Sequence, residues 1–150
     1  MKKVFCIIEL VFVFLLLGLL GRHCVELKNI MGTGKYNGLD IWFGQSDTFE
    51  VSSGISLFSC LWLAAVIISI VKLCQSKPNK VLCFVSCALL AICGITLFLG
   101  TTSFMIKPAN ISYDTLDQMY EISLLPPAII AGVGFIALAV LNLYGAISKK

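Results

Sequence analysis

Four long apolar runs dominate the sequence and constrain its fold more than any other feature. They cover residues 4–21, 55–74, 81–106 and 126–147, and a helix of roughly 20 apolar residues is what crosses the core of a bilayer. A chain of 150 residues that is 59% apolar and 13% charged is too small to bury four such runs in water. The sequence therefore predicts an all-α membrane protein, a single domain over residues 1–150 folded as a four-transmembrane-helix bundle.

The first run follows Met1-Lys2-Lys3, as the apolar part of a signal peptide would. It is longer than a typical signal sequence core, and no small-residue cleavage site follows it. We therefore expect it to remain as the first span.

The charged residues predict the orientation of the bundle. The side with both termini and the short loop at residues 75–80 carries seven lysines and one acid, Glu9. The loops at residues 22–54 and 107–125 carry four basic and seven acidic residues. Because lysine-rich segments stay in the cytoplasm, we expect cytoplasmic termini, two outer loops and a place in the cell membrane. The lysines are scattered over three segments, so they indicate topology and no nucleic-acid partner.

The stretch YNGLDIWFGQSDTFE in the first outer loop mixes polar and aromatic residues. Side-chain character alternates over residues 39–43 and 48–51, around the turn-rich tetrapeptide GQSD, which predicts a small extracellular β-hairpin. An isolated hairpin is marginal in water, so we expect it to cap the outer helix ends or to receive a partner protein at its edge. The residues of this predicted interaction surface are Leu39, Ile41, Trp42, Phe43 and Phe49.

Two short motifs lie in the outer loops. Asn110-Ile-Ser112 matches an N-glycosylation acceptor, so Asn110 is a candidate glycosylation site if the source is eukaryotic. The segment GTGK at residues 32–35 is similar to the end of a phosphate-binding loop. Asn29 replaces the required first glycine, and Tyr36 replaces the metal-binding hydroxyl residue. We therefore expect no nucleotide.

Small residues recur at helical spacing in the last three runs and predict close helix contacts, because small side chains let helices approach in lipid. Cysteine is a common small filler, and the pair in the third run has no His or carboxylate nearby to make a metal or redox site. No cofactor is expected. The predicted packing residues are Cys60 and Ala64 in the second run, Cys83, Cys87, Ala91 and Gly94 in the third, and Ala128 and Gly132 in the fourth.

Cys24 is the one cysteine that this topology places outside. Without an outer partner in the same chain, it is free or bridges a second copy, and the protein does not resemble a disulfide-stapled secreted domain. His23 is the single histidine, so a His-based metal triad is excluded within one chain. Neighbouring side chains do not normally converge, so His23 and Cys24 do not predict a nucleophilic pair.

Glu9 is the acid that the membrane interpretation must explain. It lies about five residues into the first span, roughly 7–8 Å below the inner surface. An acid inside a membrane is by default a functional hypothesis, so Glu9 with Asn142 or Lys72 at similar depth is a candidate proton or ion site. The alternative is that Glu9 reaches the inner boundary, is protonated, or pairs with Lys72. The lack of a second intramembrane acid or an inverted repeat favours this alternative.

These features resemble two families. The segment GLDIWFG at residues 38–44, the lysine-bearing inner loop and the glycine-rich last run resemble small uncharacterised four-helix membrane proteins of Gram-positive-type bacteria. That resemblance spans most of the chain and implies no activity. The four spans, inner termini and a Gly-Leu-x-Trp-like segment are similar to the claudin and peripheral myelin protein type of tetraspan, which implies adhesion or junction formation. That family has a cysteine pair in this loop, where this chain has only Cys24.

The sequence thus predicts a multi-pass membrane protein without enzymatic activity. We expect an accessory or structural role through contacts in the membrane and the first outer loop, with a membrane-protein partner or a second copy. The alternatives are a small transporter or oligomeric channel that uses Glu9, and an adhesion tetraspan. An enzyme is not favoured, because no acid, base and nucleophile are predicted to converge on one face.

Overall fold

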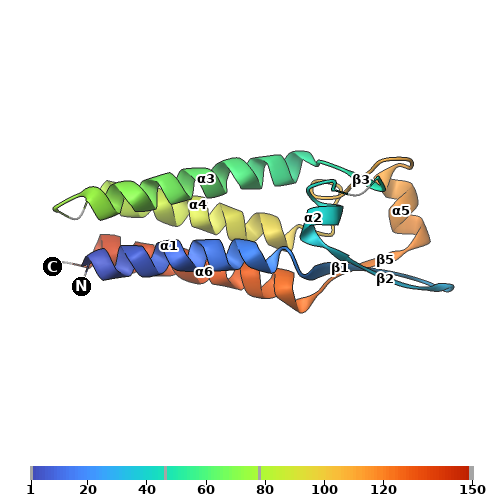
Figure 1. Cartoon of the computed structure of the whole chain (residues 1–150), viewed down its shortest axis with the longest axis horizontal. Coiled ribbons are helices and arrows are strands. Elements are labelled where there is room, and N and C mark those ends of the chain that lie inside the picture. The colour runs from blue at the N-terminus through green and yellow to red at the C-terminus, as the bar shows by residue number, and fades with distance from the viewer. Residues whose placement is uncertain (1, 46, 78, 149–150) are drawn as a thin grey trace.

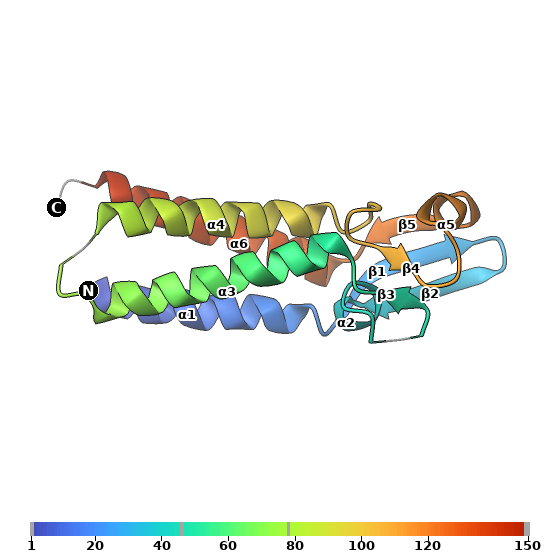
Figure 2. The same ribbon diagram turned by 90° about the horizontal axis from the view of Figure 1, so that it is seen from above.

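Four long helices form an elongated bundle with a smaller cap at one end (Figures 1 and 2). The computed structural model describes residues 2–45, 47–77 and 79–148. Within these residues, three helices are long and apolar enough to cross a membrane: α3, α4 and α6. The remaining long helix, α1, holds Lys2, Lys3 and Glu9 within its 18 residues. The bounds are α1 Lys2–Leu19, α3 Ser53–Cys74, α4 Lys80–Phe98 and α6 Pro126–Ile147.

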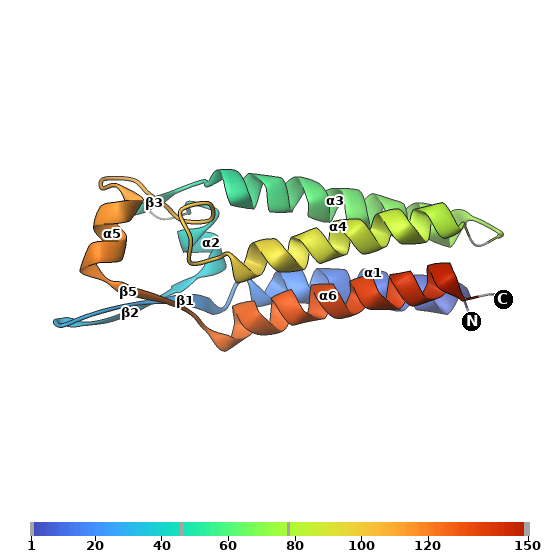
Figure 3. The same cartoon turned by 180° about the vertical axis from the view of Figure 1, so that it is seen from behind.

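Each long helix packs against two others. Helix α1 contacts α3 and α6, and α4 contacts the same two helices. The most extensive of these contacts joins α4 to α6 (Figure 3). A Cβ atom added at Gly94 would lie 2.7 Å from Cγ1 of Ile136 and 2.9 Å from the carbonyl oxygen of Gly132. The two backbones therefore approach as closely as glycine permits, a contact that small residues also allow between membrane helices.

The helices α1, α3 and α6 begin and end within two residues of the ranges predicted for them, whereas α4 is shorter than its predicted range. Helix α4 ends at Phe98, and residues 99–106 form turns instead of continuing the helix to residue 106. The indole Nε1 of Trp42 donates a hydrogen bond to the carbonyl oxygen of Gly100 at 3.0 Å. A Cβ atom at Gly100 would lie 2.6 Å from the Trp42 ring, so the chain turns where the indole packs against it.

The cap contains every strand of the described residues and two short helices. One antiparallel sheet has the strand order β2-β1-β5, and a second pairs β3 with β4 (Figure 2). In the first sheet Val25 pairs with Leu124, so the loop after α1 is joined to the chain just before α6. The bounds are β1 His23–Asn29, β2 Gly32–Asn37, α2 Gly38–Ile41, β3 Phe49–Glu50, β4 Lys107–Pro108, α5 Tyr113–Met119 and β5 Glu121–Leu124.

A small β-hairpin is present, but the prediction of its position was wrong. The hairpin is β1–β2, upstream of residues 39–51. Residues 38–41 instead form the helical turn α2, because the side chain of Asn37 accepts a hydrogen bond from the backbone N–H of Asp40 at 2.8 Å and caps that turn. Ile41 and Trp42 are both buried, and two consecutive buried residues do not fit the alternation of a strand. Strand β3 does form, but it pairs with β4.

The buried faces of the helices correct part of the predicted packing stripe. Gly94, Ala128 and Gly132 are buried, as predicted. Cys60 is exposed, and Ala64, Cys83, Cys87 and Ala91 are only half-buried. The bundle interior of α4 is instead filled by Ser86, Leu90, Cys93 and Leu97. The inward face of α4 is therefore occupied mainly by these side chains. Cys83 and Cys87, which were predicted to pack there, lie at the edge of that face.

Candidate functional site

Glu9 faces the interior of the bundle. It shares one buried face of α1 with Val13 and Leu16, at the spacing that aligns side chains along one side of a helix. Only 1% of Glu9 is exposed. The carboxylate therefore lies in the bundle interior, where its hydrogen-bond partners come from α3 and α4.

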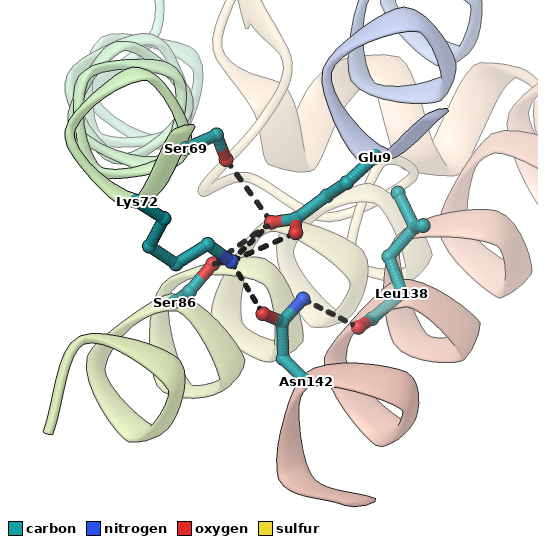
Figure 4. A network of polar contacts seen from close by, with 6 residues as sticks. All are labelled: Glu9, Ser69, Lys72, Ser86, Leu138 and Asn142. Carbon is teal, nitrogen blue, oxygen red and sulfur yellow. Dashed lines mark hydrogen bonds and ion pairs between the residues drawn. The ribbon is translucent and has the colours of Figure 1, made fainter. Parts of the chain in front are cut away.

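An ion pair is at the centre of the site (Figure 4). The ammonium Nζ of Lys72 in α3 donates to both carboxylate oxygens of Glu9, at 3.0 Å to Oε1 and 2.8 Å to Oε2. The hydroxyls of Ser69 and Ser86 also donate to Oε1 of Glu9, at 3.0 and 3.1 Å. Charge-assisted hydrogen bonds of this kind are stronger than neutral ones, and together they surround the carboxylate.

Asn142 brings the last helix, α6, into the same cluster. Its side-chain oxygen Oδ1 accepts a hydrogen bond from Nζ of Lys72 at 2.6 Å. Its amide Nδ2 donates to the backbone carbonyl of Leu138, one turn earlier, at 2.9 Å. This second bond fixes the amide so that its oxygen points at the ammonium (Figure 4). Glu9, Ser69, Lys72, Ser86 and Asn142 are called the polar cluster below.

The polar cluster unites all four long helices. Glu9 comes from α1, Ser69 and Lys72 from α3, Ser86 from α4 and Asn142 from α6. The three residues that the sequence singled out, Glu9, Lys72 and Asn142, do lie together, and Lys72 pairs with Glu9. The two serines were not predicted. Ser69 lies three residues before Lys72, a spacing that puts both on one helix face, and this signal was present in the sequence.

The chemistry of the cluster is that of a saturated network. Four donor contacts reach the Glu9 carboxylate, and the Lys72 ammonium has acceptors on Glu9 and Asn142 as well as Ser86 at 3.5 Å. A satisfied buried network of this kind fixes one arrangement of the helices. In the part of the chain that the structure describes, no three His, Cys, Asp or Glu side chains gather as metal ligands.

The aromatic residues of the cap lie mostly inside it. Ile41, Trp42 and Phe49 are buried, Phe43 is half-buried and Leu39 is exposed. The ring of Tyr36 packs edge-on against Phe49 at a centroid distance of 5.4 Å. Three of the five residues predicted for an interaction surface therefore belong to the core of the cap, where they anchor it to the helix ends.

The thiol of Cys24 is enclosed. Sγ lies 3.6 Å from the carbonyl oxygen of Leu19 and 3.8 Å from that of Leu20. Burial raises the pKa of Cys24 to about 11, and a hydrogen bond with the Gly38 backbone only partly offsets this effect. A thiol that is buried and protonated does not form a bridge to a second copy without opening of the cap.

Asn110 lies on the exposed surface of the cap. Ser112, the third residue of its motif, caps α5 by accepting a hydrogen bond from the backbone N–H of Thr115 at 3.3 Å. Glycosylation at Asn110 stays a prediction.

Comparisons of the chain with protein-family models, with curated proteins and with solved structures found no match. The polar cluster, the apolar helices and the cap are therefore the features from which a function is inferred.

Proposed function

We propose that the protein is a four-span integral protein of the cell membrane with an accessory or structural role and no enzymatic activity. The helices α3, α4 and α6 supply three apolar spans. We assign α1 as the fourth span for two reasons. Its outward side chains are mostly apolar, and its acid in the bundle interior, Glu9, is paired with Lys72. A lone charge at the centre of a span costs about 2.5–3.5 kcal/mol on an insertion scale, less near its end, and pairing with Lys72 offsets part of that cost.

The distribution of lysines supports cytoplasmic termini. Helix α1 begins, α3 ends, α4 begins and α6 ends at the end of the bundle opposite the cap (Figure 1). Lys3, Lys77 and Lys80 lie there, and they are exposed. The cap carries most of the acidic residues. Under the positive-inside rule the cap faces outward.

The single observation that carries the accessory role is the saturation of the polar cluster by all four long helices. A rigid bundle with its charges fully matched suits a scaffold that holds the cap in place. The turn between β1 and β2 projects furthest from the bundle (Figure 2). Ile30 and Met31 in this turn are 106% and 95% exposed. Two bare apolar side chains at the tip of a hairpin fit contact with a membrane-protein partner or a second copy.

The proposal is tested with the full-length chain in native membranes. Resistance to alkaline extraction tests integration. In-cell crosslinking then tests contacts, with a photoreactive residue at Ile30 compared with one at Thr33, which is also exposed but polar. A defined crosslinked species at Ile30, absent at Thr33, is the expected result. Extraction of the protein into the alkaline supernatant would contradict the four-span assignment, and identical diffuse products at both positions would contradict a contact at the tip.

A transporter or oligomeric channel is the second candidate, and one observation favours it. An ionisable pair lies inside the bundle, between α1 and α3, and such pairs mark ion or proton pathways in many membrane proteins. Flux through proteoliposomes discriminates the two functions. Flux of an ion or proton that Glu9→Gln abolishes, while Glu50→Gln in the cap leaves it intact, would favour transport. The accessory role predicts no flux above that of empty liposomes.

A further inference from the structure

A shallow groove runs along the outward face of α1 toward the cap. It has a volume of about 560 Å³ and extends from Leu10 to Leu19, with Arg22 at its cap end. Its lining is apolar except for Arg22, so the groove offers an apolar slot that ends at one cation.

Gly18 makes the floor of the groove. A Cβ atom added there would meet nothing within 4 Å, so the missing side chain leaves open space on the helix surface. Phe14 and Leu15 stand on either side and are exposed. The ring of Phe14 packs edge-on against Trp62 of α3 at 5.2 Å. One wall of the groove is therefore held in place by a neighbouring helix.

The length of the groove matches one leaflet of a bilayer. The nine residue steps from Leu10 to Leu19 correspond to about 14 Å at 1.5 Å per residue. The hydrocarbon core is about 30 Å thick, so this distance is close to half of it. A single acyl chain on the cap side of the membrane would run along the groove from the polar boundary to the midplane.

Arg22 lies just beyond the end of α1 and is exposed. Among the described residues, the ion pairs are Lys72 with Glu9 and Lys107 with Glu50, so the Arg22 guanidinium is not neutralised by an acid there. A guanidinium presents five donors in a planar fork that matches phosphate oxygens. The charge at the mouth of the groove is therefore complementary to an anionic headgroup.

We propose that this groove binds one anionic phospholipid from the leaflet on the cap side. The acyl chain lies over Gly18 between Phe14 and Leu15, and the phosphate contacts the guanidinium of Arg22. The inference rests on the proposed function in one respect, namely that α1 lies in the bilayer. A lipid held in this way covers the outward face of α1, the helix with the most charges.

Native mass spectrometry of the full-length protein tests the proposal, after delipidation and titration with phosphatidylglycerol or phosphatidylcholine. Gly18→Leu fills the groove without a clash inside the protein, and we expect about tenfold weaker binding of phosphatidylglycerol, as if one or two methylene contacts were lost. Gly145→Leu is the matched control, because a Cβ at Gly145 in α6 also meets nothing within 4 Å. It should leave the affinity unchanged.

The headgroup contact has its own pair of variants. Arg22→Gln should weaken phosphatidylglycerol binding about fivefold, the effect of one basic residue near an anionic headgroup, and remove the preference over phosphatidylcholine. Lys35→Gln changes the net charge equally at an exposed position on β2 and should preserve that preference. Wild-type affinity in Gly18→Leu, or equal losses in the variants and their controls, would overturn the proposal.

A separate measurement keeps this result distinct from the four-span assignment. In native membranes, a cysteine at Leu15 should be protected from a membrane-impermeant maleimide. Strong labelling of Leu15→Cys relative to the wild-type protein would place α1 outside the bilayer and overturn both proposals. Protection of Leu15→Cys together with unchanged lipid binding in Gly18→Leu would overturn the lipid site alone.

Discussion

The Nζ atom of Lys72 lies 2.8 Å from Oε2 of Glu9, and the two residues are 63 positions apart in the sequence. Their side chains are 6% and 0% exposed. Each charge would be costly in the bundle interior without the other. The pair therefore couples the positions of α1 and α3, and the hydroxyls of two serines and the amide of Asn142 complete the coordination.

Replacing Lys72 by Met is expected to destabilise the folded protein strongly. The Glu9 carboxylate would stay buried without its cation, and breaking a buried ion pair in this way costs about 3–5 kcal/mol. Equilibrium unfolding of the purified protein in mixed micelles measures the change. Lys77→Met, at an exposed position in the turn after α3, is the matched control and should be near neutral.

The double variant Glu9→Gln/Lys72→Met separates a stranded charge from a simple loss of packing. Removing both charges should recover a large part of the stability lost in Lys72→Met, because no uncompensated ion remains. If the double variant is as unstable as the sum of the two single variants, the two side chains do not interact and the ion pair is refuted.

The second ion pair should contribute far less to stability. Lys107 and Glu50 lie 2.6 Å apart, but their side chains are 59% and 50% exposed. Exposed pairs typically contribute 0.2–1 kcal/mol, and salt screens them. Glu50→Gln should therefore shift the free energy of unfolding by less than about 1 kcal/mol, with the difference vanishing in 1 M salt. A loss of several kcal/mol that persists in high salt would contradict this expectation.

Gly94→Ala should disturb the contact between α4 and α6. The new methyl group would meet Ile136 at 2.7 Å and the Gly132 carbonyl at 2.9 Å, and overpacking of this kind typically costs about 1–3 kcal/mol. Gly145→Ala adds the same methyl group in open space and should not destabilise α6. Thermal unfolding of the two variants in identical nanodiscs measures the difference. Equal melting temperatures would show that these helices are not in close contact.

Cys24 should be unreactive in the folded protein. A pKa raised from 9.0 to about 11 lowers the thiolate fraction at pH 8 by about 100-fold, and the thiolate is the reactive form. In a variant that keeps only this cysteine, iodoacetamide should modify the denatured chain rapidly and the native chain barely at all. Rapid modification of the native protein, or a reducible dimer under oxidising conditions, would show that the thiol is exposed.

The raised pKa of Cys24 also predicts a direction for pH dependence. Folding favours the protonated thiol, so its contribution to stability is complete below pH 9 and is lost as the pH rises from 9 toward 11. The difference in free energy of unfolding between the wild type and Cys24→Ala should therefore shrink over that interval. A difference that is constant from pH 8 to 11 would contradict burial of the thiol.

The long helices could be predicted from the sequence because their signal is local. A run of apolar residues and the flanking charges identify a helix without knowledge of its neighbours. The cap could not be predicted in the same way. Residues 39–43 alternate in character as a strand does, yet the Asn37 cap and the burial of both Ile41 and Trp42 favour a helical turn at residues 38–41. Strand β5 has its partner almost a hundred residues away, in β1, and no short window contains that information.

The polar cluster was partly predictable. Glu9, Lys72 and Asn142 are conspicuous in apolar runs, and counting residues from the helix ends placed them at similar depth. The rotation of each helix about its axis could not be counted in this way. It brings Ser69 and Ser86 to the carboxylate and turns Cys60 outward. That rotation is decided by the fit of large side chains such as Leu90 and Phe135, which exists only once the helices are assembled.

The pairing of β1 with β5 has a consequence for biosynthesis. β1 leaves the ribosome after the first helix, but β5 follows the third long helix and precedes the last. Until β5 has been synthesised, one edge of β1 has no partner, and such an edge is prone to pairing with other chains. The newly made polypeptide thus passes through an interval in which this edge is exposed, and a chaperone that binds it during that interval is expected to raise the yield of folded protein.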